Sequence, residues 1–131
     1  MHAKGSFQVT NWDESLLFDE NGGSKVTRAT VSKSFEGDIA GEGTVEWLMG
    51  YKDDGTATFV GLERVVGRVG ERAGSFVLQH EGEFDGEAAK GTLTVVPGSG
   101  TEDLKSISGE GTFEAGMGAD GVRNVELEYD V

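Results

Sequence analysis

Hydrophobic and polar residues alternate with a period of two along most of this chain. The runs that alternate or are rich in β-forming residues cover residues 4–10, 26–35, 44–52, 57–69, 73–84, 87–96, 108–115 and 122–130. Because successive side chains of a strand point to opposite faces of a sheet, this pattern predicts eight strands. Their short, even spacing predicts a single all-β domain over residues 1–131, either an antiparallel barrel or a sandwich.

Residues 11–24 interrupt the alternation, and there Asp13 is a candidate N-cap for a short helical turn over residues 15–18. Elsewhere, three tight-turn signals separate consecutive strands: Asp54-Gly55, Gly70-Glu71 and Asp85-Gly86. Such pairs suit two-residue hairpin turns, because Gly and Asp tolerate the positive φ angles that these turns require. A four-residue first loop would give the same strand register, whereas a three-residue loop would break it.

The register set by these turns brings titratable side chains together. It places Glu46 opposite Glu63, and it places His80 between Gly61 and Gly91 on the neighbouring strands. Apolar side chains share this face, which we interpret as the barrel interior: Leu48, Phe59, Phe76, Leu78 and Phe84. The glycines would leave open volume beside His80, as a small-molecule site requires.

The opposite face of the third and fourth strands is too apolar to be left in water. It carries Trp47, Met49, Tyr51, Val60 and Leu62. We expect this face to form a homo-oligomer interface or to lie under a covering segment. The alternative is that inside and outside are reversed for these two strands.

Composition narrows the classes of partner. The chain has 131 residues, 22 glycines, no cysteine and a formal net charge of −13. Glycines spread through β-like segments favour a curved sheet or barrel. The negative charge repels phosphates and anionic lipids, so we expect neither nucleic acid nor membrane as partner. With neither a signal-peptide core nor a bilayer-length apolar segment, a cytoplasmic location is expected.

Glu46, Glu63 and His80 are the candidate catalytic residues. Two carboxylates facing each other in an apolar interior destabilise the sheet unless a proton, a cation or a ligand offsets the repulsion. As a coupled pair, one of them would have a raised pKa. The alternative is a polar network in which Arg28 or Arg64 neutralises one glutamate. A Glu-Glu-His metal site lacks any closely spaced ligand motif, so we expect no metal and no cofactor.

Two further features have structural interpretations. The segment Gly116-Met117-Gly118-Ala119-Asp120-Gly121 matches the letters of a dinucleotide-binding fingerprint, but a strand follows it where the fingerprint needs a helix. We interpret it as a hairpin loop. Trp12 and Trp47 are expected to be packing residues.

Several strings resemble a family of small bacterial proteins of unknown function with an allene oxide cyclase-like, calycin-like barrel. They are Val45-Glu46-Trp47-Leu48-Met49, Asp54-Gly55-Thr56-Ala57, Phe59-Val60-Gly61-Leu62-Glu63-Arg64, Gly74-Ser75-Phe76-Val77-Leu78-Gln79-His80 and Val95-Val96-Pro97-Gly98-Ser99-Gly100-Thr101. The resemblance covers nearly the whole chain. It implies an eight-stranded antiparallel β-barrel with a central cavity, but no established activity.

Taken together, these features predict a barrel with an apolar cavity that carries a Glu/Glu/His cluster. The leading hypothesis is proton-transfer chemistry of the isomerase, cyclase or lyase type on a small apolar molecule. In it Glu63 is the general base, Glu46 its partner acid and His80 the orienting group. Leu48, Phe59, Gly61, Phe76, Leu78, Phe84 and Gly91 would contact the ligand. The alternative is a non-catalytic binder or carrier of a small apolar ligand.

Overall fold

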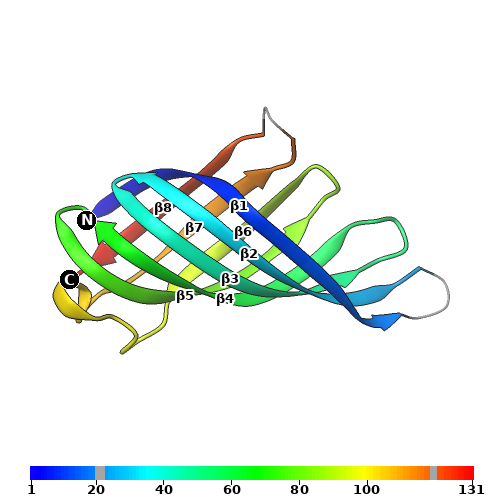
Figure 1. Cartoon of the computed structure of the whole chain (residues 1–131), viewed down its shortest axis with the longest axis horizontal. Coiled ribbons are helices and arrows are strands. Elements are labelled where there is room, and N and C mark those ends of the chain that lie inside the picture. Colours follow the sequence, from blue (N-terminus) through cyan, green and yellow to red (C-terminus); the bar gives the residue numbers. More distant parts are fainter. Residues whose placement is uncertain (20–22, 119–120) are drawn as a thin grey trace.

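The computed structural model describes residues 1–19, 23–118 and 121–131. Its strands form one closed barrel, in which each strand pairs antiparallel with the next and β1 pairs with β8 (Figure 1). The elements are β1 (His2–Asp19), β2 (Lys25–Gly37), β3 (Ile39–Tyr51), β4 (Ala57–Val69), β5 (Arg72–Phe84), β6 (Ala88–Val95), η1 (Glu102–Leu104), β7 (Ser108–Gly116) and β8 (Arg123–Asp130). The predicted eight-stranded antiparallel β-barrel is confirmed, and closure of the sheet excludes the sandwich.

The first strand is much longer than the sequence pattern suggests. The helical turn expected over residues 15–18 is wrong, because β1 continues to Asp19 and pairs with β2 along its length. The register shifts between Val9 and Asn11 and again between Leu16 and Phe18. Each bulge breaks the alternation of faces while the ladder of backbone hydrogen bonds continues, so the interrupted pattern was a bulged strand.

The hairpin between β3 and β4 has a three-residue loop. Lys52 N donates to Thr56 O over 2.8 Å, and Gly55 adopts a φ of +88° between them. Such a loop is a type I turn closed by a glycine in the left-handed region. It shifts the register by one residue, so that Val45 faces Glu63 and Glu46 faces Leu62. The faces predicted for β3 are therefore reversed.

This reversal changes the expected oligomer interface. Trp47 and Met49 are 1% and 2% exposed inside the barrel, and Tyr51 is half-buried at its end. Val60 and Leu62 do lie outside, 48% and 54% exposed. The alternative interpretation, reversed faces, is thus correct for β3 and wrong for β4. Association of copies through this outer face stays a prediction.

The two later hairpins differ in how well their turns were predicted. The register between β4 and β5 is as predicted, with Gly61 facing His80 and Glu63 facing Leu78. Between β5 and β6 the turn lies one residue farther along the chain, which shifts the register by two. Asp85 N donates to Ala88 O at 3.2 Å, and Asp85 Oδ1 accepts hydrogen bonds from the backbone nitrogens of Glu87 and Ala88 at 2.8 and 2.9 Å. A shift of two preserves the faces. His80 consequently faces Leu93, and Gly91 faces Gly82.

The two ends of the barrel are built differently. At the end that carries both termini in Figure 1, η1 lies in the connection between β6 and β7. Leu104 and Ile107 of this connection are buried in the core, and Thr101 Oγ1 accepts a hydrogen bond from Ser75 N at 3.0 Å. The connection therefore closes this end. The β1–β2, β3–β4, β5–β6 and β7–β8 hairpins project from the other end.

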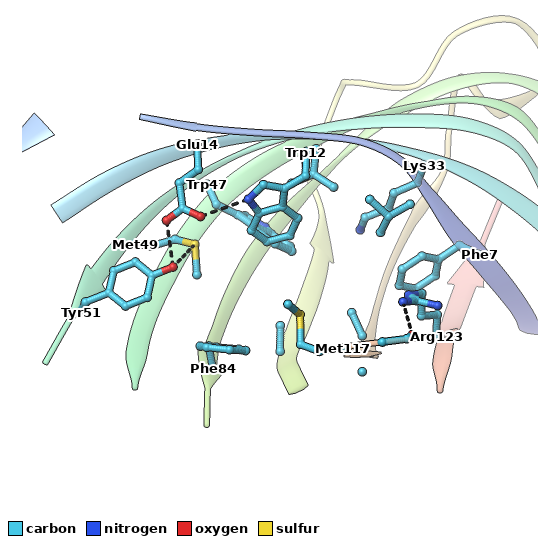
Figure 2. A pocket seen from close by; sticks show the side chains of 16 residues that line it. Phe7, Trp12, Glu14, Lys33, Trp47, Met49, Tyr51, Phe84, Met117 and Arg123 are labelled. Carbon is cyan, nitrogen blue, oxygen red and sulfur yellow. Dashed lines mark hydrogen bonds between the residues drawn. The ribbon is translucent and has the colours of Figure 1, made fainter. Parts of the chain in front are cut away.

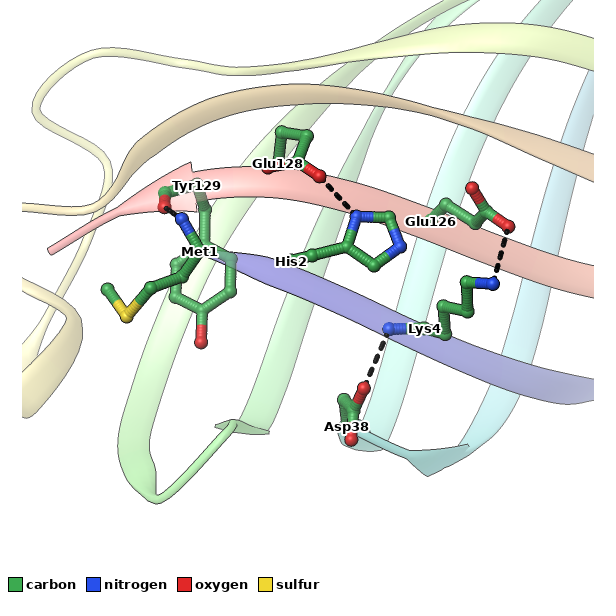
Figure 3. Close-up of polar contacts among 7 residues, drawn as sticks. All are labelled: Met1, His2, Lys4, Asp38, Glu126, Glu128 and Tyr129. Carbon is green, nitrogen blue, oxygen red and sulfur yellow. Dashed lines mark hydrogen bonds and ion pairs between the residues drawn. The ribbon is translucent and has the colours of Figure 1, made fainter.

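The seam between β1 and β8 completes the barrel (Figure 3). The Met1 nitrogen donates to Tyr129 O at 2.8 Å, and His2 Nδ1 contacts the Glu128 carboxylate. Lys4 N donates to Asp38 Oδ2 at 3.0 Å. These contacts fasten the start of β1 to both of its neighbours, so the sheet has no open edge there.

Candidate functional site

A cavity of about 440 Å³ lies at the hairpin end of the barrel (Figure 2). The residues that line it come from β1, β2 and β3 and from the ends of β5 to β8. Most of their side chains are apolar: Phe7, Val9, Trp12, Val31, Trp47, Met49, Phe84, Ala89, Ala115 and Met117. Four charged or polar side chains also reach it, namely Glu14, Lys33, Tyr51 and Arg123. An apolar hollow of this size with a few placed polar groups is typical of small-molecule sites.

Glu63 lies inside the barrel next to a lysine and a histidine. Its side chain is 2% exposed. Lys33 Nζ lies 3.4 Å from Glu63 Oε2 and donates a long hydrogen bond of 3.5 Å to Oε1. His80 Nε2 lies 2.9 Å from the same Oε1. The three buried side chains thus form one cluster, in which Lys33 supplies the charge that a buried carboxylate requires.

Trp47 sets the tautomer of His80. The indole Nε1–H of Trp47 donates to His80 Nδ1 over 3.1 Å, so Nδ1 carries no proton. The neutral imidazole then holds its proton on Nε2 and donates it to Glu63 Oε1. Hydrogen bonds therefore run in one direction, from the indole through the imidazole to the carboxylate.

The Lys33 ammonium is surrounded by aromatic rings. Its nitrogen lies 4.7, 5.3, 5.5 and 5.9 Å from the ring centroids of Phe7, Phe113, Trp47 and Phe35. These rings stabilise the cation through their quadrupoles, but they exclude water from it. Lys33 belongs to β2, and in Figure 2 its side chain lies near Phe7.

Burial and ion pairing decide the charge states in this cluster. Burial alone would raise the pKa of Glu63, but the Lys33 ammonium and the hydrogen bond with His80 outweigh it and lower that pKa. Burial lowers the pKa of Lys33 against the opposing effect of Glu63. Burial likewise lowers the pKa of His80. At neutral pH these directions keep Glu63 ionised and His80 neutral, and the Glu63 carboxylate opposes the loss of the Lys33 proton.

A second carboxylate lies at the cavity mouth. Glu14 accepts hydrogen bonds from Thr27 Oγ1 at 2.7 Å, from Tyr51 Oη at 2.8 Å and from Trp12 Nε1 at 3.0 Å. Burial opposes ionisation, but these donors together lower the pKa of Glu14. Burial and the bond to Glu14 raise the pKa of Tyr51 to about 12. The mouth therefore carries a fixed negative charge and a neutral phenol.

Comparison with known proteins places this barrel in a family. A model of the DUF3224 family, described as proteins of unknown function, matches residues 3–129. The chain belongs to the DUF3224 family. The crystal structure of a protein of unknown function from this family, from Shewanella oneidensis MR-1, is similar with a TM-score of 0.81 and 28% identity. The alignment covers 99% of this chain and 96% of that one. Comparison with curated proteins gave no match.

The predicted membership of a bacterial family of unknown function is thus confirmed. The predicted pair of facing glutamates, in contrast, does not exist in this DUF3224 barrel. Glu46 lies on the outer surface, where its carboxylate contacts Arg28 Nε at 2.6 Å and Thr30 Oγ1 at 2.9 Å. Those hydrogen bonds, first of all the one from Arg28, lower the pKa of Glu46. The prediction of a raised pKa from two coupled carboxylates is therefore wrong, because the one-residue shift of β3 separates them. Arg28 neutralises Glu46, and Lys33 neutralises Glu63.

Most of the residues predicted to contact a ligand do not line this cavity. Phe84 lines the cavity as predicted, whereas Leu48 lies on the outer surface, 49% exposed. The other five residues are not among those that line the cavity: Phe59, Gly61, Phe76, Leu78 and Gly91. Phe59, Phe76 and Leu78 are buried core residues.

Gly61 and Gly91 leave no open volume. A Cβ atom added at Gly61 would lie 2.6 Å from Trp47 Cδ1, and one added at Gly91 would lie 2.8 Å from Phe113 Cε1. Each glycine makes room for an aromatic ring that crosses the barrel interior. The free space lies farther toward the hairpin end, beyond Trp47.

Lys33 is the functional candidate that sequence reasoning missed. Its signal was present, because Thr27, Ala29, Val31 and Phe35 alternate with polar residues in β2 and Lys33 occupies the same face. A lysine within an apolar strand face is unusual enough to suggest a buried partner. Within residues 1–19, 23–118 and 121–131 no group of three or more His, Asp or Glu side chains could hold a metal ion.

Loop residues 119 and 120 of the fingerprint-like segment lie outside the described residues. Around them, Gly116 ends β7, and Gly116 N donates to Val122 O at 2.7 Å as a hairpin connection would. The segment joins two strands and precedes no helix, so the dinucleotide interpretation has no structural basis. Trp47 packs in the core as expected, and Trp12, 42% exposed, packs edge-on against it with 5.7 Å between ring centroids; both rings also line the cavity.

Proposed function

We propose that this protein binds a small, mainly apolar and uncharged molecule in the cavity at the hairpin end of its barrel. The observation that carries the proposal is the cavity itself, about 440 Å³ in volume and walled by aromatic and methionine side chains. Such a volume suits a ligand of drug-like size or smaller. The connection around η1 closes the opposite end, so the ligand would enter between the hairpins.

Charge favours an uncharged ligand. Lys33 is already neutralised by Glu63, and Glu14 adds a negative charge at the mouth. The whole chain carries a net charge of −13, which repels anions at a distance. Arg123 lines the same cavity, and its Nη2 donates to Gly118 O at 2.8 Å. Glu14 and Arg123 balance each other, as do Glu63 and Lys33, so the site offers a carboxylate ligand no net attraction.

Titration with a neutral fluorescent dye, N-phenyl-1-naphthylamine, tests this proposal. We expect saturable binding to the wild-type protein and at least about a tenfold loss in Ala115→Phe, because the new ring would occupy the cavity. Thr92→Phe, on the outer face of β6, is the matched control and should bind as the wild type does. Leu62→Asp should also retain binding, because the outer apolar face is a different surface. Equal binding by all variants would contradict the proposal.

Proton-transfer catalysis is the second proposal, now with Lys33 in place of Glu63 as the group that contacts the substrate. One observation favours it: Lys33 lines the cavity and is in contact with Glu63. Glu63 and His80 are not among the cavity-lining residues, so Lys33 would be the group that meets a substrate. The lowered pKa of Glu63 makes it a weak base, and Glu46 takes no part. If a substrate is found, Lys33→Met should abolish turnover, whereas Glu46→Gln should leave it unchanged.

No helix among the described residues is long and apolar enough to cross a membrane. The expected cytoplasmic location, and the expected lack of nucleic acid and membrane partners, stay predictions from composition.

A further inference from the structure

Lys33 combines three properties that seldom occur together in one lysine. Its side chain is 2% exposed, it lines the cavity, and its nearest charge is the Glu63 carboxylate at 3.4 Å. Both of its contacts with Glu63 are long, at 3.4 and 3.5 Å. Aromatic rings surround the rest of the ammonium, and within the described part of the chain Glu63 is its hydrogen-bond acceptor, over a long distance. A ligand atom that accepts a hydrogen bond would give the ammonium a second acceptor.

The Glu63 carboxylate can likewise accept a further hydrogen bond. Oε2 of Glu63 is buried and accepts no hydrogen bond from the described residues, although Lys33 Nζ lies 3.4 Å away. Oε1, in contrast, accepts from His80. The oxygen that faces Lys33 is therefore free to take a proton from it. Burial lowers the pKa of Lys33, which favours that transfer, whereas the lowered pKa of Glu63 opposes it.

We propose that the Lys33 ε-amine condenses reversibly with the carbonyl group of an apolar aldehyde bound in the cavity, and that Glu63 acts as the proton acceptor and then as the counter-ion. This inference deepens the proposed function and rests on it, because the aldehyde must occupy the same cavity. It assigns the ligand class, an uncharged carbonyl compound with an apolar body.

The steps balance without any further reactant. Lys33 first gives one proton to Glu63 Oε2, which leaves a neutral amine whose lone pair attacks the carbonyl carbon. The resulting carbinolamine loses its hydroxyl group as water, with the proton returned by Glu63. The product is a protonated imine on Lys33 beside a Glu63 carboxylate. Overall, one ammonium and one aldehyde give one protonated imine and one water, and hydrolysis reverses the reaction.

The site also explains why an imine could persist there. A protonated imine keeps the charge that the ammonium had, so the ion pair with Glu63 and the contacts with the rings of Phe7 and Trp47 are retained. Burial of the nitrogen limits access of water, which would hydrolyse the bond. Lys90 also has a carboxylate partner, Glu114 at 3.4 Å, but its side chain is 61% exposed, so water can reach its nitrogen.

The test is reductive trapping with cinnamaldehyde and sodium cyanoborohydride near neutral pH, followed by peptide mapping by mass spectrometry. We expect Lys33 to be labelled at least about tenfold more than Lys90 in the same wild-type molecules. Excess cinnamyl alcohol, which lacks the carbonyl group, should protect Lys33 and leave Lys90 unchanged. Lys33→Arg keeps a cation beside Glu63 but cannot form an imine, so its labelling should fall to that of the surface lysines.

Parallel binding measurements separate the two proposals. Trp12 and Trp47 both line the cavity, so cinnamyl alcohol should quench their fluorescence in a saturable way. If it does so while Lys33 is labelled no more than Lys90, the imine proposal is overturned and the binding function stands. If it neither quenches nor protects, and the neutral dye also fails to bind, both proposals are wrong. Because the labelling ratio is read within wild-type protein, the result does not depend on whether Lys33→Arg folds.

Discussion

Lys33 Nζ and Glu63 Oε2 lie 3.4 Å apart in the interior of the barrel, on strands β2 and β4 that are not neighbours in the sheet. Both side chains cross the interior, and each is 2% exposed. Gly43 of the intervening β3 makes this contact possible, because a Cβ atom there would lie 2.5 Å from Glu63 Oε2. A small residue in the middle strand thus lets two charged side chains meet.

This pair predicts strong thermodynamic coupling. Glu63→Gln leaves the Lys33 cation buried without a counter-charge, and Lys33→Met leaves the Glu63 carboxylate buried without one. Each substitution should therefore lower the free energy of unfolding by about 3–5 kcal/mol. The double variant should cost less than the sum of the single variants, because no unpaired charge remains. Urea unfolding of all four proteins measures the coupling. A stability gain in Glu63→Gln alone would contradict the ion pair.

The cluster also predicts a loss of stability in mild acid. The pKa of His80 is lowered from 6.5, so below about pH 6.5 the unfolded chain takes up a proton that the folded state resists. Stability present above that pH should be lost as pH falls, by at most about 1.4 kcal/mol per pH unit for this one proton. The lowered pKa of Glu63 adds a loss of the same sign below about pH 4.5. The lowered pKa of Lys33 adds a further rise in stability as the pH increases toward 10.5, its unlowered value.

His80→Gln isolates the histidine contribution. A glutamine amide can accept from Trp47 and donate to Glu63 as the imidazole does, but it does not titrate. Between about pH 7 and pH 5 the variant should therefore show a flatter stability curve than the wild-type protein. Parallel curves, measured by urea unfolding at each pH, would show that surface groups cause the acid effect.

Gly61 predicts a packing effect that can be checked against a glycine in β3. A Cβ atom at position 61 would lie 2.1 Å from Glu46 O and 2.6 Å from Trp47 Cδ1. Gly61→Ala should therefore destabilise the barrel by about 1–3 kcal/mol and displace the indole, which Trp fluorescence would report. At Gly50 the nearest atom is Thr58 O at 3.8 Å, so Gly50→Ala should be neutral or stabilise by about 0.4–1 kcal/mol. Equal effects of the two substitutions would refute the packing argument.

The outer face of β3 and β4 predicts self-association. Leu48, Val60 and Leu62 are about half exposed there, between 48% and 54%. Arg64 and Glu46 lie on the same face, so two copies related by a two-fold axis could pair opposite charges around an apolar centre. We expect an oligomer in sedimentation velocity that Leu62→Asp converts to monomer. Thr92→Asp adds the same charge on β6 and should not change it. A monomeric wild-type protein would contradict the prediction.

Part of the site could be predicted because its geometry is local. The β4–β5 hairpin has the two-residue turn that Gly70-Glu71 indicates, and Gly70 adopts a φ of +61°. Once that register is set, Glu63 and His80 must share a face, and the structure joins them at 2.9 Å. The faces of β5 and β6 were also predicted correctly, because the error in the position of their turn shifts the register by two residues.

The rest of the site could not be predicted, because it depended on a one-residue difference in loop length and on closure of the sheet. Asp54-Gly55 is compatible with either a two- or a three-residue loop, and the energies of such turns differ too little to choose between them from sequence. The choice decides whether Trp47 or Glu46 points inward, because side chains alternate with a period of two. Packing of the barrel made that choice, since burying Trp47 and Met49 removes more apolar surface from water than burying Glu46 and Leu48.

The sequence by itself determined the eight strands, their antiparallel order and the hairpin that aligns Glu63 with His80, because alternation and turn chemistry act between near neighbours in the chain. Tertiary structure alone decided that Lys33 is the cation opposite Glu63 and that the cavity lies beyond Trp47. Lys33 and Glu63 are 30 residues apart and meet across the interior, where the closed curvature of the sheet sets the distance. A pattern among near neighbours in the sequence carries no information about the distance between Lys33 and Glu63.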